Sequence, residues 1–389
     1  MKKIQSVFVL TILICINASS QTTQDLRIRS VAVPFLRIAP DARAAGMGDN
    51  GIATLPDANA PFWNLAKTPF AKAKTAFSLT YTPWLKDLGL TDVYLASLGG
   101  YHKLGDGEAA IGGGLRFFSL GNIQFTDFAG NNLATFRPRE MAIDFGYARK
   151  LSDRLSIAAA LRYINSNLAT GNFSGTDFSA GSTVAGDLSL YYDGTQEELN
   201  GGGFAWGIAI SNLGGKIGYT NNNQNRDFIP ANLGLGVQYT KAIDDVNKIT
   251  FALDINKSLV PAPPVRSDIT GANNDSIDIV NYAEYRSQSV LSSWGKSFSD
   301  GTSLFKSMTY SLGVEYNYAD QFFFRAGYFH EDVTEGNRKF VSVGAGIKFN
   351  SMTVNLSYIV PAGQGVNRNP LSNTLRFGIA FDLNADETN

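Results

Sequence analysis

Cysteine and histidine are almost absent from this sequence. The only cysteine is Cys15, near the N-terminus, and the only histidines are His102 and His330. If Cys15 is lost with an export signal, the chain can form no disulfide, thiolate nucleophile or cysteine-ligated metal site. A Ser-His-Asp esterase stays formally open, but the sequence contains no G-x-S-x-G motif. We therefore expect no catalytic residue, no cofactor and no metal ion.

The first twenty residues have the pattern of a secretory signal peptide. Lys2 and Lys3 precede an apolar stretch over residues 4–16, and small residues at 18–20 stand before Gln21. The alternative, a membrane anchor, fails because this stretch is too short to span a bilayer as a helix. The sequence therefore predicts an exported protein with residues 1–20 removed.

Charge is sparse and balanced. Charged residues make up 17% of the chain, below the roughly 25% of soluble proteins. Without Lys2 and Lys3, 31 basic residues face 34 acidic ones, which gives no basic surface for nucleic acid. Two acidic pairs, Glu197/Glu198 and Asp275/Asp278, are interpreted as solvated loop charges and not as a Ca²⁺ site.

Phe, Tyr and Gly are abundant, and from about residue 75 bulky apolar residues alternate with polar or small ones. Residues 249–256 and 375–383 show this alternation without a break. Because successive strand side chains point to opposite faces, each such segment has one apolar and one polar face. Fourteen segments follow, near residues 75–84, 91–103, 108–120, 138–151, 153–168, 182–193, 202–213, 228–242, 247–259, 306–319, 320–331, 337–349, 350–361 and 371–383.

These segments favour a transmembrane β-barrel over a soluble β-sandwich. They are longer than typical soluble strands and long enough to cross a membrane at a tilt. Aromatic residues gather at segment ends, where the interfacial girdles of a barrel lie. No apolar run after the signal peptide reaches 18 residues, which argues against transmembrane helices. We predict an all-β, 14-stranded antiparallel outer-membrane barrel over residues 75–389.

Connection lengths orient this barrel. Turns after even-numbered segments are mostly short, whereas connections after odd-numbered segments are mostly long. Outer-membrane barrels have short periplasmic turns and long extracellular loops. His102 is therefore expected at the periplasmic end and His330 at the extracellular end, too far apart to share a site.

Residues 21–74 lack strand alternation and contain five prolines. Their length suits a plug inside a lumen that fourteen strands leave too wide for side chains to fill, and residues 58–67 are expected to form a short helix. A disordered periplasmic tail is the alternative. Arg325 and Arg376, on inward positions, are expected to hold the plug by pairing with carboxylates such as Asp41, Asp49 or Asp57.

The plug contains the stretch APDARAAGMGDNGIATLPDANAPFWNLAK, residues 39–67. Its G-x-G-x-x-G spacing at Gly46, Gly48 and Gly51 lacks the preceding strand, the following helix and the acidic residue that a dinucleotide site needs. We interpret these glycines as a compact backbone run that lets the plug approach the barrel wall.

This stretch resembles the N-terminal signature of FadL-like outer-membrane proteins, specifically the PorV branch of the type IX secretion system of Bacteroidetes. Residues 294–307, 315–349 and 357–383 are also similar to that branch, although Leu65 stands where the branch has proline. The resemblance assigns the plug motif to Asp41, Arg43, Gly46, Met47, Gly48, Gly51, Asp57, Trp63 and Asn64.

The resemblance implies a non-enzymatic role in protein transport. Proteins of that branch accept folded cargo carrying a C-terminal signal domain after it leaves the large translocon barrel (SprA- or Sov-like). They deliver it to the surface attachment complex with its PorU-like sortase. The alternative is a FadL-type channel for long-chain fatty acids or other hydrophobic molecules, embedded in the same outer-membrane lipid.

The connection over residues 260–305 is the best candidate for a partner-binding surface. It is far longer than chain closure requires and offers aromatic side chains of the kind that dominate protein interfaces. The candidate residues are Tyr282, Tyr285, Trp294, Phe298 and Phe305. The alternative is that these aromatics pack the loop onto itself or onto the membrane surface.

Overall fold

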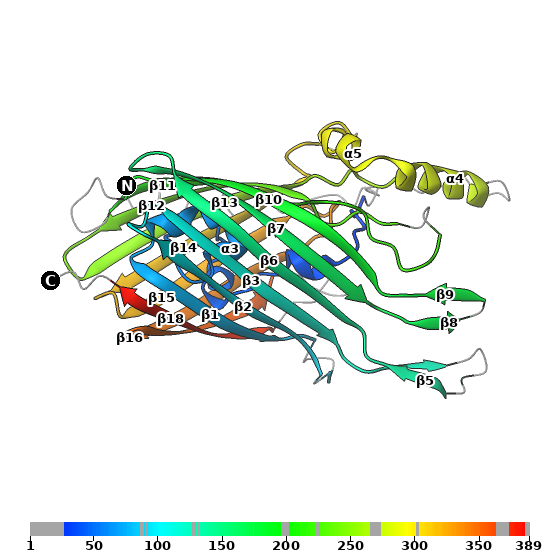
Figure 1. Cartoon of the computed structure of the whole chain (residues 1–389), viewed down its shortest axis with the longest axis horizontal. Helices are drawn as coiled ribbons and strands as arrows, with labels where there is room; N and C mark the ends of the chain where they lie inside the picture. The colour runs from blue at the N-terminus through cyan, green and yellow to red at the C-terminus, as the bar shows by residue number, and fades with distance from the viewer. Residues whose placement is uncertain are drawn as a thin grey trace, which may run out of the picture.

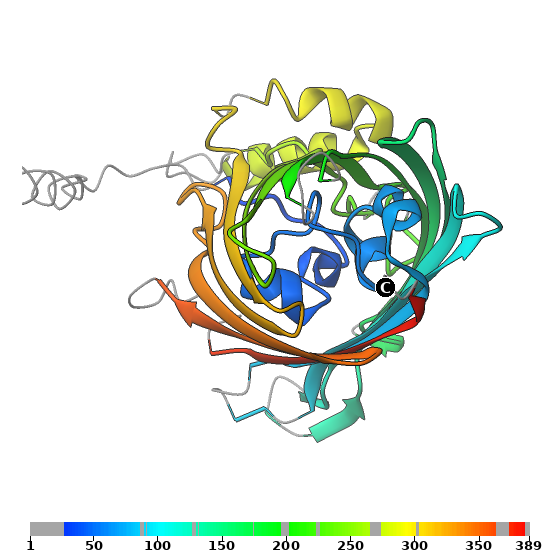
Figure 2. The same cartoon turned by 90° about the vertical axis from the view of Figure 1, so that its left-hand side faces the viewer.

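The chain forms a closed antiparallel β-barrel with its N-terminal segment inside (Figures 1 and 2). A computed structural model describes residues 27–85, 89–90, 92–126, 130, 132–173, 175–195, 202–222, 226–264, 274–300, 303–362 and 373–385. The predicted signal peptide, the pair Glu197/Glu198 and the side chains of Asp275 and Asp278 lie outside this description.

Within the described residues, fourteen strands make up the barrel, and the last strand pairs with the first. They are β1 (Ala73–Pro83), β2 (Val93–Leu104), β3 (Ala109–Leu120), β6 (Arg139–Lys150), β7 (Leu155–Asn167), β10 (Gly181–Asp193), β11 (Gly203–Gly214), β12 (Asn232–Ala242), β13 (Asn247–Ser258), β14 (Met308–Tyr318), β15 (Phe322–Glu331), β16 (Lys339–Phe349), β17 (Met352–Pro361) and β18 (Leu375–Ala385).

The fourteen strands correspond one to one with the predicted segments. The starts of β12 and β18 differ most: the sequence predicted them at residues 228 and 371, and they begin at Asn232 and Leu375. For β12 the cause is visible. Pro230 stands between these positions, and a proline has no N–H for the sheet ladder. The fold class predicted from the alternating pattern is therefore confirmed.

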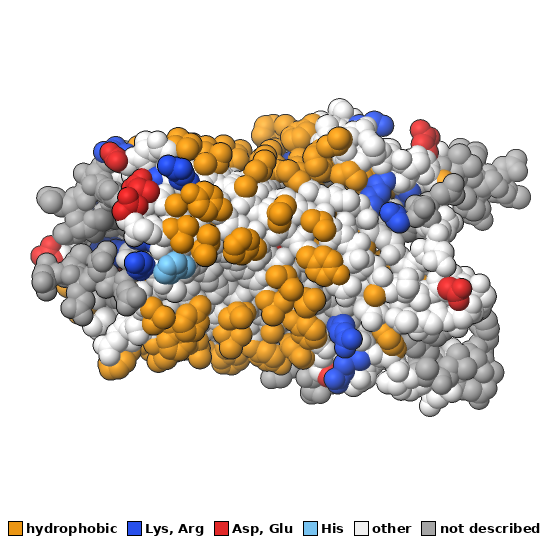
Figure 3. Space-filling view, in the orientation of Figure 1, with side chains coloured by type: hydrophobic (Ala, Val, Ile, Leu, Met, Phe, Trp, Pro, Cys, Tyr) orange, Lys and Arg blue, Asp and Glu red, His pale blue; other side chains and the backbone are white. Residues whose placement is uncertain are grey.

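The barrel has an apolar exterior and a polar interior. On β6 and β7, Phe145 and Leu161 point outward with 63% and 69% of their surface exposed. Inward positions carry buried polar side chains such as Gln238 and Asp254. Figure 3 shows apolar side chains spread along the barrel wall. This is the arrangement of a transmembrane barrel. Among the described helices, none has the length and apolar character needed to cross a membrane.

Long connections gather at one end of the barrel and short turns at the other (Figure 1). The long-loop end carries two hairpins, β4 (Ile123–Thr126) with β5 (Asn132–Phe136) and β8 (Gly171–Phe173) with β9 (Thr176–Phe178). It also carries helices α4 (Asn274–Ser287) and α5 (Val290–Lys296). The sequence did not predict these elements inside the loops.

The described part of the N-terminal segment lies inside the barrel (Figure 2). It contains the short helices η2 (Pro34–Arg37), α2 (Ala42–Gly46), α3 (Ala60–Trp63) and η3 (Leu65–Phe70). The single helix predicted over residues 58–67 is wrong, because Asn64 adopts an extended conformation and its side chain accepts a hydrogen bond from the Ala66 nitrogen. We call residues 27–71 the plug.

Candidate functional site

A buried polar network holds the centre of the plug. Asp41 caps α2, where its carboxylate accepts hydrogen bonds from the Ala44 nitrogen at 2.8 Å and from the Trp63 indole at 2.6 Å. The Arg43 guanidinium donates to Asp57 at 3.0 Å and to both carboxylate oxygens of Glu315 on β14, at 3.0 and 3.1 Å. Burial raises the pKa of Asp41. Four predicted motif residues therefore form two polar contacts: Asp41 with Trp63 inside the plug, and Arg43 with Asp57, which also joins the plug to the wall through Glu315.

The two inward arginines do not pair as the sequence predicted. Arg325 binds Glu315 at 2.6 Å and Asn355 at 2.8 Å, so it reaches the plug only through the carboxylate that it shares with Arg43. Arg376 is fully buried, and no hydrogen bond to it is found within the described part of the chain. Within the described residues, no direct hydrogen bond joins Arg325 or Arg376 to a plug carboxylate, because Arg43 takes Asp57 and Trp63 takes Asp41. Arg376 interacts with Asp49 and Asp41 only at longer range, through their charges.

Each glycine of the G-x-G-x-x-G stretch meets a different steric demand. Gly48 has φ +72°, and a Cβ there would lie 2.8 Å from the Tyr328 nitrogen. A Cβ at Gly46 would lie 3.0 Å from the Cα of Gly344, and one at Gly51 would overlap the Trp63 ring. Glycine therefore lets α2 and the following turn lie directly against β15 and β16.

The wall offers matching glycines to the plug side chains. Met47 is fully buried, and its backbone lies against Gly313 and Gly327. Three plug side chains also pack on strand glycines: Ile52 over Gly207, Gly234 and Gly236, Phe62 over Gly99 and Gly114, and Leu65 over Gly112 and Gly146. The plug and the barrel wall therefore have complementary shapes along much of the barrel circumference.

Hydrogen bonds between backbone groups and side chains also hold the plug in place. The nitrogens of Gly51 and Ile52 both donate to Asp254 of β13, at 2.8 and 2.9 Å. Asn64 donates from its amide to the carbonyls of Ile52 and of Leu190 on β10, at 3.1 and 3.0 Å. The Lys67 ammonium donates to the Gly51 carbonyl at 2.6 Å, and its burial lowers its pKa to about 8.

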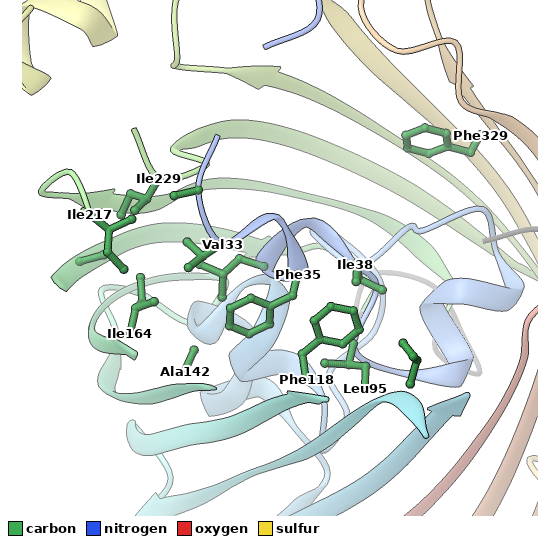
Figure 4. Close-up of a cluster of buried hydrophobic side chains, with 14 of the residues drawn as sticks. Val33, Phe35, Ile38, Leu95, Phe118, Ala142, Ile164, Ile217, Ile229 and Phe329 are labelled. Carbon is green, nitrogen blue, oxygen red and sulfur yellow. The ribbon is translucent and has the colours of Figure 1, made fainter. Parts of the chain in front are cut away.

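An apolar cluster packs around the side of the plug that faces the long loops (Figure 4). Phe35 is fully buried and stacks on Phe118 of β3 with ring centroids 6.3 Å apart. Val33, Leu95 and Ile164 belong to the same cluster. Burial of side chains this large contributes substantially to stability, so the plug is held by apolar packing as well as by polar contacts.

A cavity of about 150 Å³ lies beside the plug. Its walls include charged side chains: Arg29, Arg37, Arg116, Arg338, Asp49, Glu331 and Glu335. Typical small-molecule sites are about 300–1,000 Å³ and mainly apolar. The cavity is therefore smaller and more polar than a site for a long apolar chain.

The plug also reaches the loops at the long-loop end through Arg29, a residue that the sequence did not single out. Its guanidinium donates to the Val260 carbonyl at 2.7 Å, to Asp300 at 2.7 Å and to Glu335. These three partners belong to two different loops. Nothing in the local sequence distinguishes Arg29 from a solvated arginine, because its partners are more than 200 residues away.

The five aromatic candidates of the long loop have different surroundings. Tyr285 is buried against Phe228 and donates a hydrogen bond to the Pro261 carbonyl. Trp294 is half-buried. Tyr282, Phe298 and Phe305 are exposed, at 41%, 48% and 74%. Tyr285 therefore packs the loop onto itself, the alternative that the sequence left open, whereas the exposed candidates stay available to a partner. Leu291, 75% exposed, was missed.

The described residues contain no group of three or more His, Asp or Glu side chains placed to hold a metal ion. His102 pairs across the sheet with Thr75 near the short-turn end of the barrel, whereas His330 lies at the long-loop end of β15. The two histidines therefore stand at opposite ends of the barrel, as the connection lengths predicted.

Comparisons with known proteins agree with this architecture. The family model described as type IX secretion system protein PorV matches residues 21–265, which include the plug and the barrel through β13. None of the curated proteins matches the chain.

Solved structures share the fold at low identity. The TodX deltaS2S3 mutant monoaromatic hydrocarbon channel is 13% identical with a TM-score of 0.53, over 88% of this chain and 98% of that one. The Ralstonia pickettii toluene transporter TbuX is 14% identical with a TM-score of 0.50, over 88% and 97%.

Proposed function

This chain belongs to the PorV family of type IX secretion system proteins, and we propose that it carries cargo from the translocon to the cell surface without passing it through its own barrel. Membership makes it an outer-membrane barrel of that system. The proposed cargo are proteins with the C-terminal signal domain, and the proposed partners are the large translocon barrel (SprA- or Sov-like) and the attachment complex with its PorU-like sortase.

The interlocked plug is the structural observation that supports this route. A plug held by Arg43, by Asp254 and by strand glycines leaves no passage for a folded protein. Cargo and partners would then contact the outer wall and the extracellular loops. The plug motif residues serve in this proposal to keep the barrel closed and rigid.

Deletion of the gene tests the proposal. We expect cargo with the C-terminal signal to be retained inside the cell, and we expect plasmid-borne wild-type protein to restore surface cargo, measured by surface proteolysis. An undiminished amount of surface cargo in the deletion strain would contradict the proposal. The proposed role is non-enzymatic, and the two histidines that could have supplied a general base lie at opposite ends of the barrel.

Site-specific cross-linking tests the partner-binding loop. The exported chain has no cysteine, so Tyr282→Cys on α4 places a single thiol on the loop. With a short bifunctional reagent in whole cells, we expect adducts with the translocon barrel or with cargo. Leu161→Cys, on the outward face of β7, is the matched control and should give none. Adducts of equal yield from both positions would contradict a specific role for the loop.

A hydrophobic-molecule channel is the second candidate, and one observation favours it. The β10–β11 ladder shifts register between Gly186 and Leu188, an irregularity of the kind that a lateral opening would need. However, Asp187 at this point binds Arg162 at 2.8 Å and the Asn212 nitrogen at 2.7 Å, which closes the gap. Impaired uptake of hydrophobic substrates in the deletion strain, with secretion intact, would favour the channel.

A further inference from the structure

Helix α5 lies on the outside of the barrel wall and not over its mouth. In the view along the barrel, α5 lies outside the ring of strands (Figure 2), and α5 is nearer to the barrel body than α4 is (Figure 1). Loop helices that project away from the membrane would not occupy this position.

A buried lysine fixes this placement. On β13, Phe251, Leu253, Ile255 and Lys257 occupy alternate positions and share the outward face, since Asp254 between them points to the plug. Lys257 is nevertheless only 2% exposed. Its ammonium donates to the Ser297 carbonyl at 2.8 Å and lies 5.5 Å from the centre of the Phe298 ring. The end of α5 therefore covers the row of β13 that elsewhere faces lipid.

The surface of α5 is divided into three stripes. Ser293 and Ser297 are buried and face the protein. Leu291, Gly295 and Phe298 follow one another at helical spacing and form an apolar stripe, in which Leu291 is 75% exposed. Three further residues at the same spacing form a polar exposed stripe: Ser292, Lys296 and Ser299. A helix with one apolar and one polar open side is typical of a membrane interface.

The apolar stripe continues into the lipid-facing side of β14. Phe305, 74% exposed, accepts a hydrogen bond through its carbonyl from the Tyr310 hydroxyl at 3.0 Å. Tyr310 stands two residues before Leu312, which points outward and is 52% exposed. Figure 3 shows apolar side chains running from the region of α5 onto the wall. Phe305 therefore lies beside Tyr310, a member of the outward row of β14, and exposes its ring there.

We propose that α5 and the turn after it form a lipid-binding collar, defined as Leu291, Phe298 and Phe305, that lies in the outer-leaflet interface of the membrane. The occupant of this surface is lipid, because the collar is continuous with the lipid-facing rows of β13 and β14, and because aromatic side chains prefer the interface. The collar leaves α4, with Tyr282, as the part of the loop that faces the aqueous phase.

Spin labelling tests the collar. A nitroxide is placed at Leu291→Cys in the otherwise cysteine-free exported protein, reconstituted in phosphatidylcholine–phosphatidylglycerol vesicles. We expect the label to be accessible to dissolved oxygen, which concentrates in lipid, and shielded from a water-soluble nickel chelate. Leu312→Cys on the outward face of β14 is the lipid control, and Ser292→Cys on the polar stripe of α5 is the aqueous control.

Each outcome decides the question. A label at position 291 that behaves like the one at 292 would place the stripe in water and overturn the collar. A label at 291 that is shielded from both reagents would mean protein contact and would also overturn it. Leu291 is on the surface, so its replacement is not expected to affect folding, and heat-modifiability on a gel checks this. The result is independent of secretion, so it stands apart from a failure of the proposed transport function.

Discussion

Replacement of Gly48 by alanine measures how tightly the plug is interlocked. Gly48 has φ +72°, and a Cβ there would lie 2.8 Å from the Tyr328 nitrogen and 3.0 Å from the Leu312 carbonyl oxygen. The left-handed conformation costs alanine about 1–2 kcal/mol, and overpacking a tight interface adds about 1–3 kcal/mol. We therefore expect Gly48→Ala to lower the free energy of unfolding by about 2–5 kcal/mol.

Gly89 is the matched control for this variant. It has φ +77°, and a Cβ there would meet nothing within 4 Å. Gly89→Ala should therefore lose only the conformational part, about 1–2 kcal/mol. The assay is guanidinium unfolding in lipid vesicles followed by tryptophan fluorescence. If Gly48→Ala shifts the midpoint no further than Gly89→Ala does, the plug is not packed against β15 as described, and the reasoning is refuted.

Three further predictions concern charge. Arg43→Met should lower the free energy of unfolding by about 3 kcal/mol, because it removes an ion-pair partner from the buried Glu315 and another from Asp57. Lys248→Met is the control: it breaks a surface pair with Asp320 and should cost less than about 1 kcal/mol in the same denaturation assay. Lys67 has a folded-state pKa of about 8 against an ordinary value of 10.5, so the folded plug binds fewer protons than the unfolded chain between pH 8 and 10.5, and stability should rise with pH across that window. Lys67→Met should remove this rise in denaturation midpoints measured from pH 7.5 to 10.5, and a slope unchanged by the substitution would contradict it.

Strand alternation predicted the barrel because a lipid-facing wall imposes one demand on every strand. Residues such as Phe251 and Leu312 must be apolar outward, and Asp254 must be polar or small inward, whatever the loops do. The predicted count and order of strands therefore needed no tertiary information. The start of β12 was misplaced because Pro230, a single residue without an N–H, outweighs the apolar pattern around it.

The partners of the buried charges could not be predicted from the sequence. Arg43 meets Glu315 across 272 residues and Arg29 meets Glu335 across 306, so local spacing carries no signal for either pair. Arg325 was correctly placed inside the barrel by the alternation, but its partner depends on how the plug sits against β14. Periodicity gives the face of a residue, whereas its partner depends on the packing of a segment that has no periodicity.

In the long loop over residues 260–305, composition alone could not separate buried from exposed aromatic side chains. Composition selected Tyr285 and Phe298 equally, since both are aromatic residues in a long connection. Their surroundings differ because Tyr285 lies over Phe228 in the loop interior, whereas Phe298 lies over Lys257 on the outer wall. Leu291 escaped attention because interface statistics favour aromatic anchors, although a lipid surface selects for apolar area of any kind.

The glycine-rich stretch illustrates how structural context gives a motif its meaning. The spacing of Gly46, Gly48 and Gly51 matches that of a phosphate-binding turn, in which glycine allows a ligand to approach the backbone. Here the approaching group is the protein itself: the backbone of Gly344 at the first position, the backbone of Tyr328 at the second and the Trp63 ring at the third. The physical requirement is the same in both cases, namely the absence of a Cβ where another group must come close. A plug inside a lumen closed by fourteen strands meets that requirement wherever the two backbones come into contact without room for a Cβ. At Met47 the wall meets it instead of the plug, through Gly313 and Gly327.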